Sequence, residues 1–351
     1  MESSLNPVKQ LVKIGAGVFM LLLSILFFTP HLAAQANTYS TYLPIAFKAV
    51  PTPILQPLTR SSSENSWTAT WNQPASDITR YEVREAPNTN FESPLFYNTT
   101  ETNYAFSTPA SINNSYCYQV RAIANEIPSI WSNTRCIVGD YYDDFSSGNS
   151  GWAIRRQDTD DVDNSAFYEN GEFALKLRGR WDYAIASPLA EAPTGAYRLE
   201  TRVRFDSSVD NLHAYGIIFG GDWNGLACPT DHYWTCFNQY YRLLVIWHGS
   251  PDTLRVNLKR IDSHDPEDNA GRGITLVDYK EVSMNPNDWN TWAVEVHDNG
   301  DIVVLVNGRV WATVNDSTYL ANRYFGVFAA SDEYLGAEPH FDHYGLTHIS
   351  E

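Results

Sequence analysis

Apolar and polar residues alternate with period two through much of the chain, most clearly from Trp289 to Asp316. The turn sequences Asp298-Asn299-Gly300 and Asn307-Gly308 divide this stretch into three runs. Their apolar positions are Val294 and Val296, then Ile302, Val304 and Val306, then Val310, Ala312 and Val314. Because Asn and Gly tolerate positive φ, Asn-Gly between alternating runs strongly indicates a β-hairpin. The pattern predicts three antiparallel strands in a sheet that buries one face, with Trp289, Trp292 and Trp311 among them.

The same alternation predicts short strands elsewhere, and no segment shows helical periodicity over more than about two turns. In residues 51–139 the predicted strands are Trp67–Trp71, Tyr81–Arg84, Leu95–Asn98, Tyr104–Ser107, Ser115–Ile123 and Thr134–Val138. In residues 140–351, besides the Trp289–Val314 set, they are Glu172–Leu177, Tyr197–Phe205, Tyr215–Phe219, Tyr241–Trp247, Thr253–Ile261, Tyr324–Ala329 and Phe341–Ile349. We therefore expect an all-β chain: a small immunoglobulin-like sandwich and then a larger antiparallel jelly-roll sandwich.

Composition and charge narrow the class of partner. Aromatic residues make up 14% of the chain, charged residues 19%, and the net charge is −17. This anionic balance would repel phosphate backbones, so we expect no nucleic-acid partner. It is compatible with cations and with neutral partners such as glycans.

The N-terminus has the pattern of an export signal. Lys9 and Lys13 precede the apolar run Ile14–Phe28, and Ala34-Gln35-Ala36 is a small-x-small cleavage site. The run is shorter than the about 20 residues of a membrane span, although an uncleaved anchor is the alternative. We expect a signal peptide over residues 1–36, a linker over 37–50, and a secreted protein, extracellular or at the cell surface, with no membrane contact after cleavage.

Four cysteines in an exported chain are expected to form disulfides. The economical pairing is Cys117 with Cys136 and Cys228 with Cys236, because each pair then lies within one predicted domain. The alternative is four free thiols. Neither pair has the spacing or histidine partners of a zinc site.

Residues 51–139 resemble a fibronectin type III module. Trp71 before Asn72-Gln73-Pro74, the segments Ile78–Ala86 and Ser115–Ile123, and Trp131-Ser132 occupy the places of that family's landmarks. The resemblance implies that Cys117 and Cys136 lie on neighbouring strands, although a disulfide there departs from the usual module.

Residues 140–351 resemble the concanavalin A-like lectin/glucanase superfamily, and within it the laminin-G-like sandwiches of exported bacterial proteins. The resemblance rests on segments that follow in order: Asp143-Asp144-Phe145, Gly151-Trp152, Phe167–Phe173, Tyr215–Phe219, Tyr241–Trp247, Trp289–Trp292, Val306–Gly308 and Phe341–Gly345. It implies a two-sheet jelly roll.

Because this superfamily includes glucanases, a catalytic carboxylate pair is the first chemistry to consider. Retaining glycosidases need two carboxylates about 5–5.5 Å apart, and the family's Glu-x-Asp-x-x-Glu and Glu-x-Asp-x-Glu signatures are absent. Glu295 and Asp298 have the wrong spacing, and Glu333 and Glu338 fall in a predicted loop. Acidic residues at positions 262–268 fall in another. No Gly-x-Ser-x-Gly nucleophile motif is present either. We therefore expect no enzyme activity, with a divergent glycoside hydrolase as an alternative.

Calcium is the metal that the resemblance favours. In many members of the superfamily the ion joins the first and last strands through an Asp of the closing Phe-Asp segment. Asp342 and Asp144 fall on those positions. The alternative is that both carboxylates cap turns. His340 and His343, which flank Asp342, are interpreted as surface or edge-strand histidines.

The segment Gly220–Tyr241 combines aromatic and polar residues between two predicted strands. The predicted Cys228–Cys236 bridge would make it rigid, so little would be left to order on binding. Aromatic faces stack on sugar rings, while amides and carboxylates bind sugar hydroxyls. The predicted ligand-binding residues are Trp223, Tyr233, Trp234, Asp222 and Asn224. The alternative is that these aromatic residues cover the open end of the sandwich.

Together these features predict a secreted, non-catalytic protein whose C-terminal sandwich binds a carbohydrate or cell-surface ligand. The fibronectin-like module would act as a spacer. A structural or adhesive role in protein interactions is the second hypothesis, and the sequence leaves the oligomeric state open.

Overall fold

The computed structural model describes residues 49–61, 65–152, 165–177, 183–188, 190–205, 213–223, 237–247, 253–265, 268–331 and 337–350. These residues form antiparallel strands and turns, which confirms the predicted all-β class. Chain contacts separate Met1–Lys48 from Ala49–Glu351, and only the second unit is described below. Within the described residues, no helix has the length and apolar content to span a membrane.

The first eight strands form two sheets. They are β1 (Thr59–Arg60), β2 (Ser66–Thr70), β3 (Arg80–Ala86), β4 (Leu95–Thr99), β5 (Asn103–Ser107), β6 (Ser115–Ala124), β7 (Ile127–Pro128) and β8 (Arg135–Val138). One sheet has the order β1-β2-β5 and the other β4-β3-β6-β7, with β8 beside β6. Trp67 of β2, Tyr81 of β3 and Tyr118 of β6 share one buried cluster. The two sheets therefore face each other as the predicted small sandwich.

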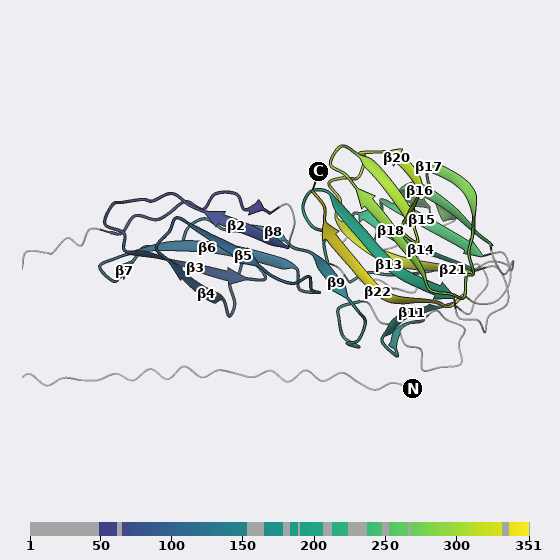
Figure 1. Ribbon diagram of the computed structural model, residues 1–351, viewed down its shortest axis with the longest axis horizontal. Helices are drawn as coiled ribbons and strands as arrows, with labels where there is room; N and C mark the ends of the chain where they lie inside the picture. Colours follow the sequence, from purple (N-terminus) through teal and green to yellow (C-terminus); the bar gives the residue numbers. More distant parts are fainter. Residues whose placement is uncertain are drawn as a thin grey trace, which may run out of the picture. The chain divides into compact units, whose positions relative to one another are not determined.

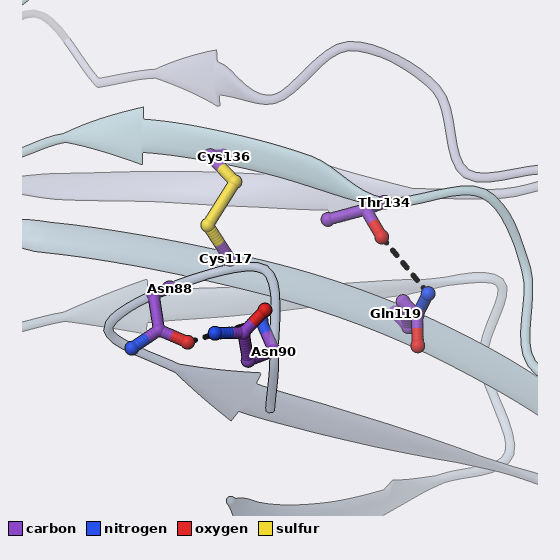
Figure 2. Close-up of a disulfide and its surroundings, with 6 residues drawn as sticks. All are labelled: Asn88, Asn90, Cys117, Gln119, Thr134 and Cys136. Carbon is purple, nitrogen blue, oxygen red and sulfur yellow. Dashed lines mark hydrogen bonds between the residues drawn. A yellow bond between two sulfur atoms is a disulfide. The ribbon is translucent and has the colours of Figure 1, made fainter. Parts of the chain in front are cut away.

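Cys117 and Cys136 form the predicted disulfide. The two cysteines are directly paired in the register of β6 and β8 (Figure 2). Beside them, the Gln119 amide of β6 donates to the hydroxyl of Thr134, the residue before β8, at 2.8 Å (Figure 2). Cys228 and Cys236 lie outside the described residues.

The remaining strands form two larger sheets (Figure 1). They are β9 (Tyr141–Asp143), β10 (Ser165–Glu169), β11 (Glu172–Lys176), β12 (Tyr183–Ala186), β13 (Tyr197–Phe205), β14 (His213–Gly221), β15 (Tyr240–Trp247), β16 (Thr253–Asp265), β17 (Asp268–Ser283), β18 (Asn290–Val296), β19 (Asp301–Val306), β20 (Arg309–Asn315), β21 (Tyr324–Ser331) and β22 (Pro339–His348). The eight-stranded sheet has the order β10-β11-β22-β13-β18-β19-β20, with β9 beside β22. The six-stranded sheet has the order β12-β21-β14-β15-β16-β17. All neighbouring pairs are antiparallel, as predicted for a jelly roll.

Alternating side chains of both larger sheets fill one core. In β13, Leu199 and Val203 point into it, and in β15 Leu243 and Val245 do so from the opposite sheet. The Trp292 indole N–H donates to the Tyr215 hydroxyl at 2.6 Å within this core, so both buried polar atoms are satisfied. Trp152 and Trp247 are also buried in this core.

The hairpins predicted around residue 300 are present. Asn307 and Gly308 have φ of 48° and 76°, as a primed two-residue turn requires. Val310 was predicted to lie on the buried face with Ala312 and Val314, but this is wrong, since it is 63% exposed. The register shifts by one residue between Val304 and Leu305, and this β-bulge turns Val310 out of the alternation.

Two further differences concern segments without clear alternation. The acidic stretch around Asp262 was expected to be a loop, but β16 continues to Asp265 and pairs with β17 from Asp268. Four register irregularities interrupt this pairing, which explains why the period-two signal is lost there. The short strands β10 and β12 were also not predicted.

Candidate functional site

The outer faces of the two larger sheets differ in kind. An antiparallel sheet that packs on a core normally presents a polar outer face. The eight-stranded sheet does so, with Arg198, Arg202 and Arg204 of β13 all in ion pairs. The six-stranded sheet instead presents a second cluster of buried apolar side chains, here called the apolar outer face: Ile185, Ala214, Ile218, Phe237, Tyr240, Leu244, Ile261, Phe328 and Ala330.

Glycines in β14 make room for aromatic rings on the six-stranded sheet. A Cβ added to Gly216 would lie 1.5 Å from the Phe328 ring, so only glycine lets this ring lie across the strand. At Gly221 an added Cβ would lie 2.8 Å from Phe237. Glycine inside a strand commonly marks such a close approach. Glycines at 216 and 221 therefore leave the space that the Phe328 and Phe237 rings occupy on the apolar outer face.

Arg242 lies on this face and is only 5% exposed. It alternates along β15 with core residues Tyr241 and Leu243, and its guanidinium carbon lies 5.4 Å from the centre of the Phe328 ring. Its Nε has no hydrogen-bond partner in the described part of the chain. Burial raises the pKa of the neighbouring Tyr240, although the Arg242 charge acts in the opposite direction. Tyr240 is therefore a neutral phenol.

Asn257 of β16 is fully buried, at 0% exposure. Both its side-chain nitrogen and its side-chain oxygen lack a hydrogen-bond partner among the described residues. It pairs in register with Leu244, and Arg242 pairs with Lys259, so Asn257 and Arg242 are diagonal neighbours on one face. Most buried polar atoms in proteins are hydrogen-bonded, so an unpaired amide requires an explanation.

The predicted binding segment begins beside this face. Trp223 pairs with Phe237 in a β-bridge, and its ring lies 5.6 Å from that of Tyr324. It packs on the apolar outer face, whereas Tyr241 points into the core. One Asp222 carboxylate oxygen accepts the backbone N–H groups of Asn238 at 2.9 Å and Gln239 at 2.6 Å. Asn224, Tyr233 and Trp234 lie outside the described residues, and ligand contact by all five predicted residues stays a prediction.

Sequence reasoning missed Arg242, Asn257 and Phe328. The signal was available in part, because Tyr241–Trp247 and Thr253–Ile261 were both predicted as strands. Arg242 then falls between apolar neighbours in β15, and Asn257 alternates with Val256 and Leu258 in β16. Their lack of partners depends on the packing of strands distant in sequence, which the alternation does not contain.

His340 corrects the expectation of a surface histidine, since it is only 6% exposed. It lies on the eight-stranded sheet between two carboxylates, with Nδ1 2.7 Å from Glu172 Oε2 and Nε2 3.6 Å from Glu338 Oε1. Glu338 also forms an ion pair with Lys176. Burial opposes ionisation of Glu338, but its bonds with His340 and Lys176 outweigh this and lower its pKa. A general acid of a glycosidase needs a raised pKa, so this carboxylate is unsuited to that role.

The two predicted calcium ligands lie near the pairing of β9 with β22. Asp144 Oδ1 accepts the Ser146 N–H at 3.1 Å and the Ser146 hydroxyl at 2.6 Å. Asp342 lies 3.2 Å from Arg202 and 3.2 Å from His343. In the described part of the chain, no three His, Cys, Asp or Glu side chains gather as a metal site. The resemblance also assigns backbone carbonyls to the calcium site, so the calcium prediction rests on the resemblance and stays a prediction.

A scan against protein-family models finds no match, and a search of curated proteins finds none. Among solved structures, the carbohydrate binding module CBM66 from Bacillus subtilis is 12% identical, with a TM-score of 0.36 over 54% of this chain and 91% of that chain. The potassium-bound carbohydrate recognition domain of Emp46p is 14% identical, with a TM-score of 0.41 over 57% and 90%. An Fn3-like protein from Clostridium thermocellum is 26% identical, with a TM-score of 0.23 over 25% and 92%. All three TM-scores are below 0.5, so these similarities do not assign a function to the chain.

Proposed function

We propose that the chain is a carbohydrate-binding protein and that the apolar outer face of the six-stranded sheet is its binding surface. The observation that carries the proposal is Asn257, whose amide is buried while neither of its polar atoms has a hydrogen-bond partner among the described residues. An amide in this state gains about two hydrogen bonds when a ligand supplies a donor and an acceptor. A vicinal pair of sugar hydroxyls supplies both.

The apolar neighbours support a sugar over a fully polar ligand. Phe328 and Tyr240 lie on the same face as Asn257, and Trp223 packs at its edge. Binding sites commonly combine a mainly apolar lining with few polar groups that fix orientation. Aromatic rings would contact the C–H faces of a sugar, while Asn257 would bind its hydroxyls.

The module arrangement belongs to the same proposal. The sandwich of β1–β8 would act as a spacer, with a boundary near residue 139. The Cys117–Cys136 disulfide supports an oxidising compartment, so we propose that the protein is exported and meets its glycan outside the cytoplasm.

A glycan array probed with the full chain, followed by calorimetric titration of the best oligosaccharide, tests the proposal. We expect Asn257→Leu to weaken binding at least tenfold, because about two hydrogen bonds to the ligand disappear. The same change should raise the free energy of unfolding of the unliganded protein by about 1–3 kcal/mol, because it removes an unpaired buried amide. A purely structural asparagine would give the opposite change in stability.

Asn98→Leu is the matched control, since Asn98 is an exposed strand residue of β4. It should leave binding and stability within about 0.5 kcal/mol of wild type. The proposal is wrong if no glycan binds, or if a glycan binds equally to the wild type and to Asn257→Leu.

A further inference from the structure

Arg242 is an unusual arginine for this chain. Acidic residues outnumber Lys and Arg by 41 to 24, yet no carboxylate pairs with Arg242 among the described residues. The other arginines on the larger sheets named above, Arg198, Arg202 and Arg204, each have an acidic partner within 3.2 Å. Arginine is almost never fully buried unless it is paired, so Arg242 lacks, within the described part of the chain, the counterion that its burial requires.

The described residues around Arg242 do not supply that counterion. Its cross-strand partners are Ile218 on β14 and Lys259 on β16, so one neighbour is apolar and the other is a cation. The Phe328 ring, 5.4 Å away, offers a cation–π contact, which compensates only part of the cost of burying a charge. An anion placed over Arg242 would complete the site.

We propose that the glycan bound on the apolar outer face is acidic, and that its carboxylate or sulfate group pairs with Arg242. This inference rests on the proposed function and narrows its ligand class. The planar guanidinium binds carboxylate and sulfate oxygens through two parallel hydrogen bonds. Asn257, the diagonal neighbour, would bind the hydroxyls of the same or the adjacent sugar, so the two residues would fix both charge and orientation.

Matched pairs of oligosaccharides test the charge requirement on the full chain. The probes are an oligogalacturonate with its carboxyl-reduced form, and a sulfated galactan oligosaccharide with its desulfated form. We expect at least one acidic member to bind at least tenfold more tightly than its neutral partner. The carboxylate and sulfate arms show which anion the site takes.

Substitutions then assign the preference to Arg242. Arg242→Gln should abolish the difference between acidic and neutral members while neutral binding persists, and Arg242→Lys should retain part of it. Arg255→Gln is the control: Arg255 lies on β16 and is paired with Glu281 at 3.7 Å. It should leave the ratio unchanged. Because Arg242 forms no ion pair with any described residue, Arg242→Gln should fold, which circular dichroism and thermal melting would verify.

The outcomes separate the two proposals. If no oligosaccharide binds, the proposed carbohydrate-binding function fails. If neutral members bind as tightly as acidic ones, the function stands and the acidic ligand is refuted. If Arg255→Gln lowers the preference as much as Arg242→Gln does, the effect is one of general surface charge, and the assignment to Arg242 is refuted.

Discussion

His340 shows how a single residue's surroundings determine its ionisation. Burial alone would lower the pKa of His340, but the nearby Glu338 carboxylate, 3.6 Å from Nε2, and the hydrogen bond between Nδ1 and Glu172 outweigh this effect and raise it. Arg204, which is itself 2.9 Å from Glu172, acts in the opposite direction. The imidazolium therefore stabilises the pairing of β11 with β22.

The raised pKa of His340 predicts a pH dependence of stability. A group whose pKa is higher in the folded state contributes its full stability below the unfolded value of 6.5. That contribution is lost as pH rises through the higher folded value. We expect His340→Gln to lower the free energy of unfolding by about 1–3 kcal/mol at pH 6. The wild type should lose this advantage toward pH 9.

Urea unfolding of both proteins between pH 6 and pH 9 measures this difference. Since Glu338 has a lowered pKa, its contribution is lost only at acid pH and does not interfere in this range. A stability difference that stays constant from pH 6 to pH 9 would show that His340 does not carry the charge.

The Cys117–Cys136 disulfide gives a second prediction at this scale. It closes a loop with a sequence separation of 19, for which the chain-entropy relation gives about 3 kcal/mol. We expect the double variant Cys117→Ala/Cys136→Ala to lose about 2–4 kcal/mol in the unfolding of the small sandwich. Unfolding is best compared without reductant, so that Cys228 and Cys236 are not affected. An unchanged unfolding midpoint would contradict the prediction.

At the scale of elements, the long hairpin of β16 and β17 depends on one glycine. A Cβ added to Gly273 would lie 1.8 Å from the Arg260 carbonyl oxygen, and backbone atoms cannot yield as a flexible side chain can. Arg260 in turn donates to Asp262 at 2.7 Å and Asp316 at 2.7 Å. A shift of the Arg260 backbone away from Gly273 would therefore also disturb the bond between Arg260 and Asp316, which lies in the loop after β20.

We expect Gly273→Ala to separate the outer parts of β16 and β17 and to cost about 1–3 kcal/mol or more. Hydrogen exchange should show faster exchange of the Arg260 and Ile261 amides. Gly148→Ala is the control, because an added Cβ there would meet nothing within 4 Å. Equal effects of the two substitutions would refute the proposed steric cause.

Sequence alternation predicted elements well where strands are regular and poorly where bulges occur. β13, Tyr197–Phe205, was predicted residue for residue because its buried and half-buried side chains alternate without interruption. β17 was missed because it pairs through repeated register shifts. The pairing order of strands, such as β22 between β11 and β13, depends on long-range contacts and is not contained in any local pattern.

The candidate site was predicted only at its edge. Trp223 was predicted as a ligand-binding residue because the segment around it is rich in aromatic and polar residues. Arg242 and Asn257 were not identified, because a charged or amide residue within a strand ordinarily faces solvent. What distinguishes them is burial without a hydrogen-bond or ion-pair partner in the described part of the chain, and this is a property of the packed sheet.

At the scale of the whole molecule, net charge and local charge oppose each other. The chain carries −17, whereas Arg242 and Lys259 lie opposite each other on the proposed binding face. The Debye length is about 30 Å at 0.01 M salt and about 8 Å at 0.15 M. At low salt an approaching acidic glycan therefore experiences the whole anionic molecule, and at physiological salt mainly the groups near the site.

This difference predicts an unusual salt dependence. The association rate constant of an acidic oligosaccharide should rise between 10 and 150 mM NaCl, because screening removes long-range repulsion. Arg242→Gln should keep that rise but increase the dissociation rate constant at least tenfold, since a buried charge pair acts mainly on dissociation. Surface plasmon resonance at several salt concentrations measures both constants. If association instead slowed as salt increased, attraction by the cations near the site would dominate even at low salt. The claim that the net negative charge of the molecule repels the ligand at long range would then be wrong.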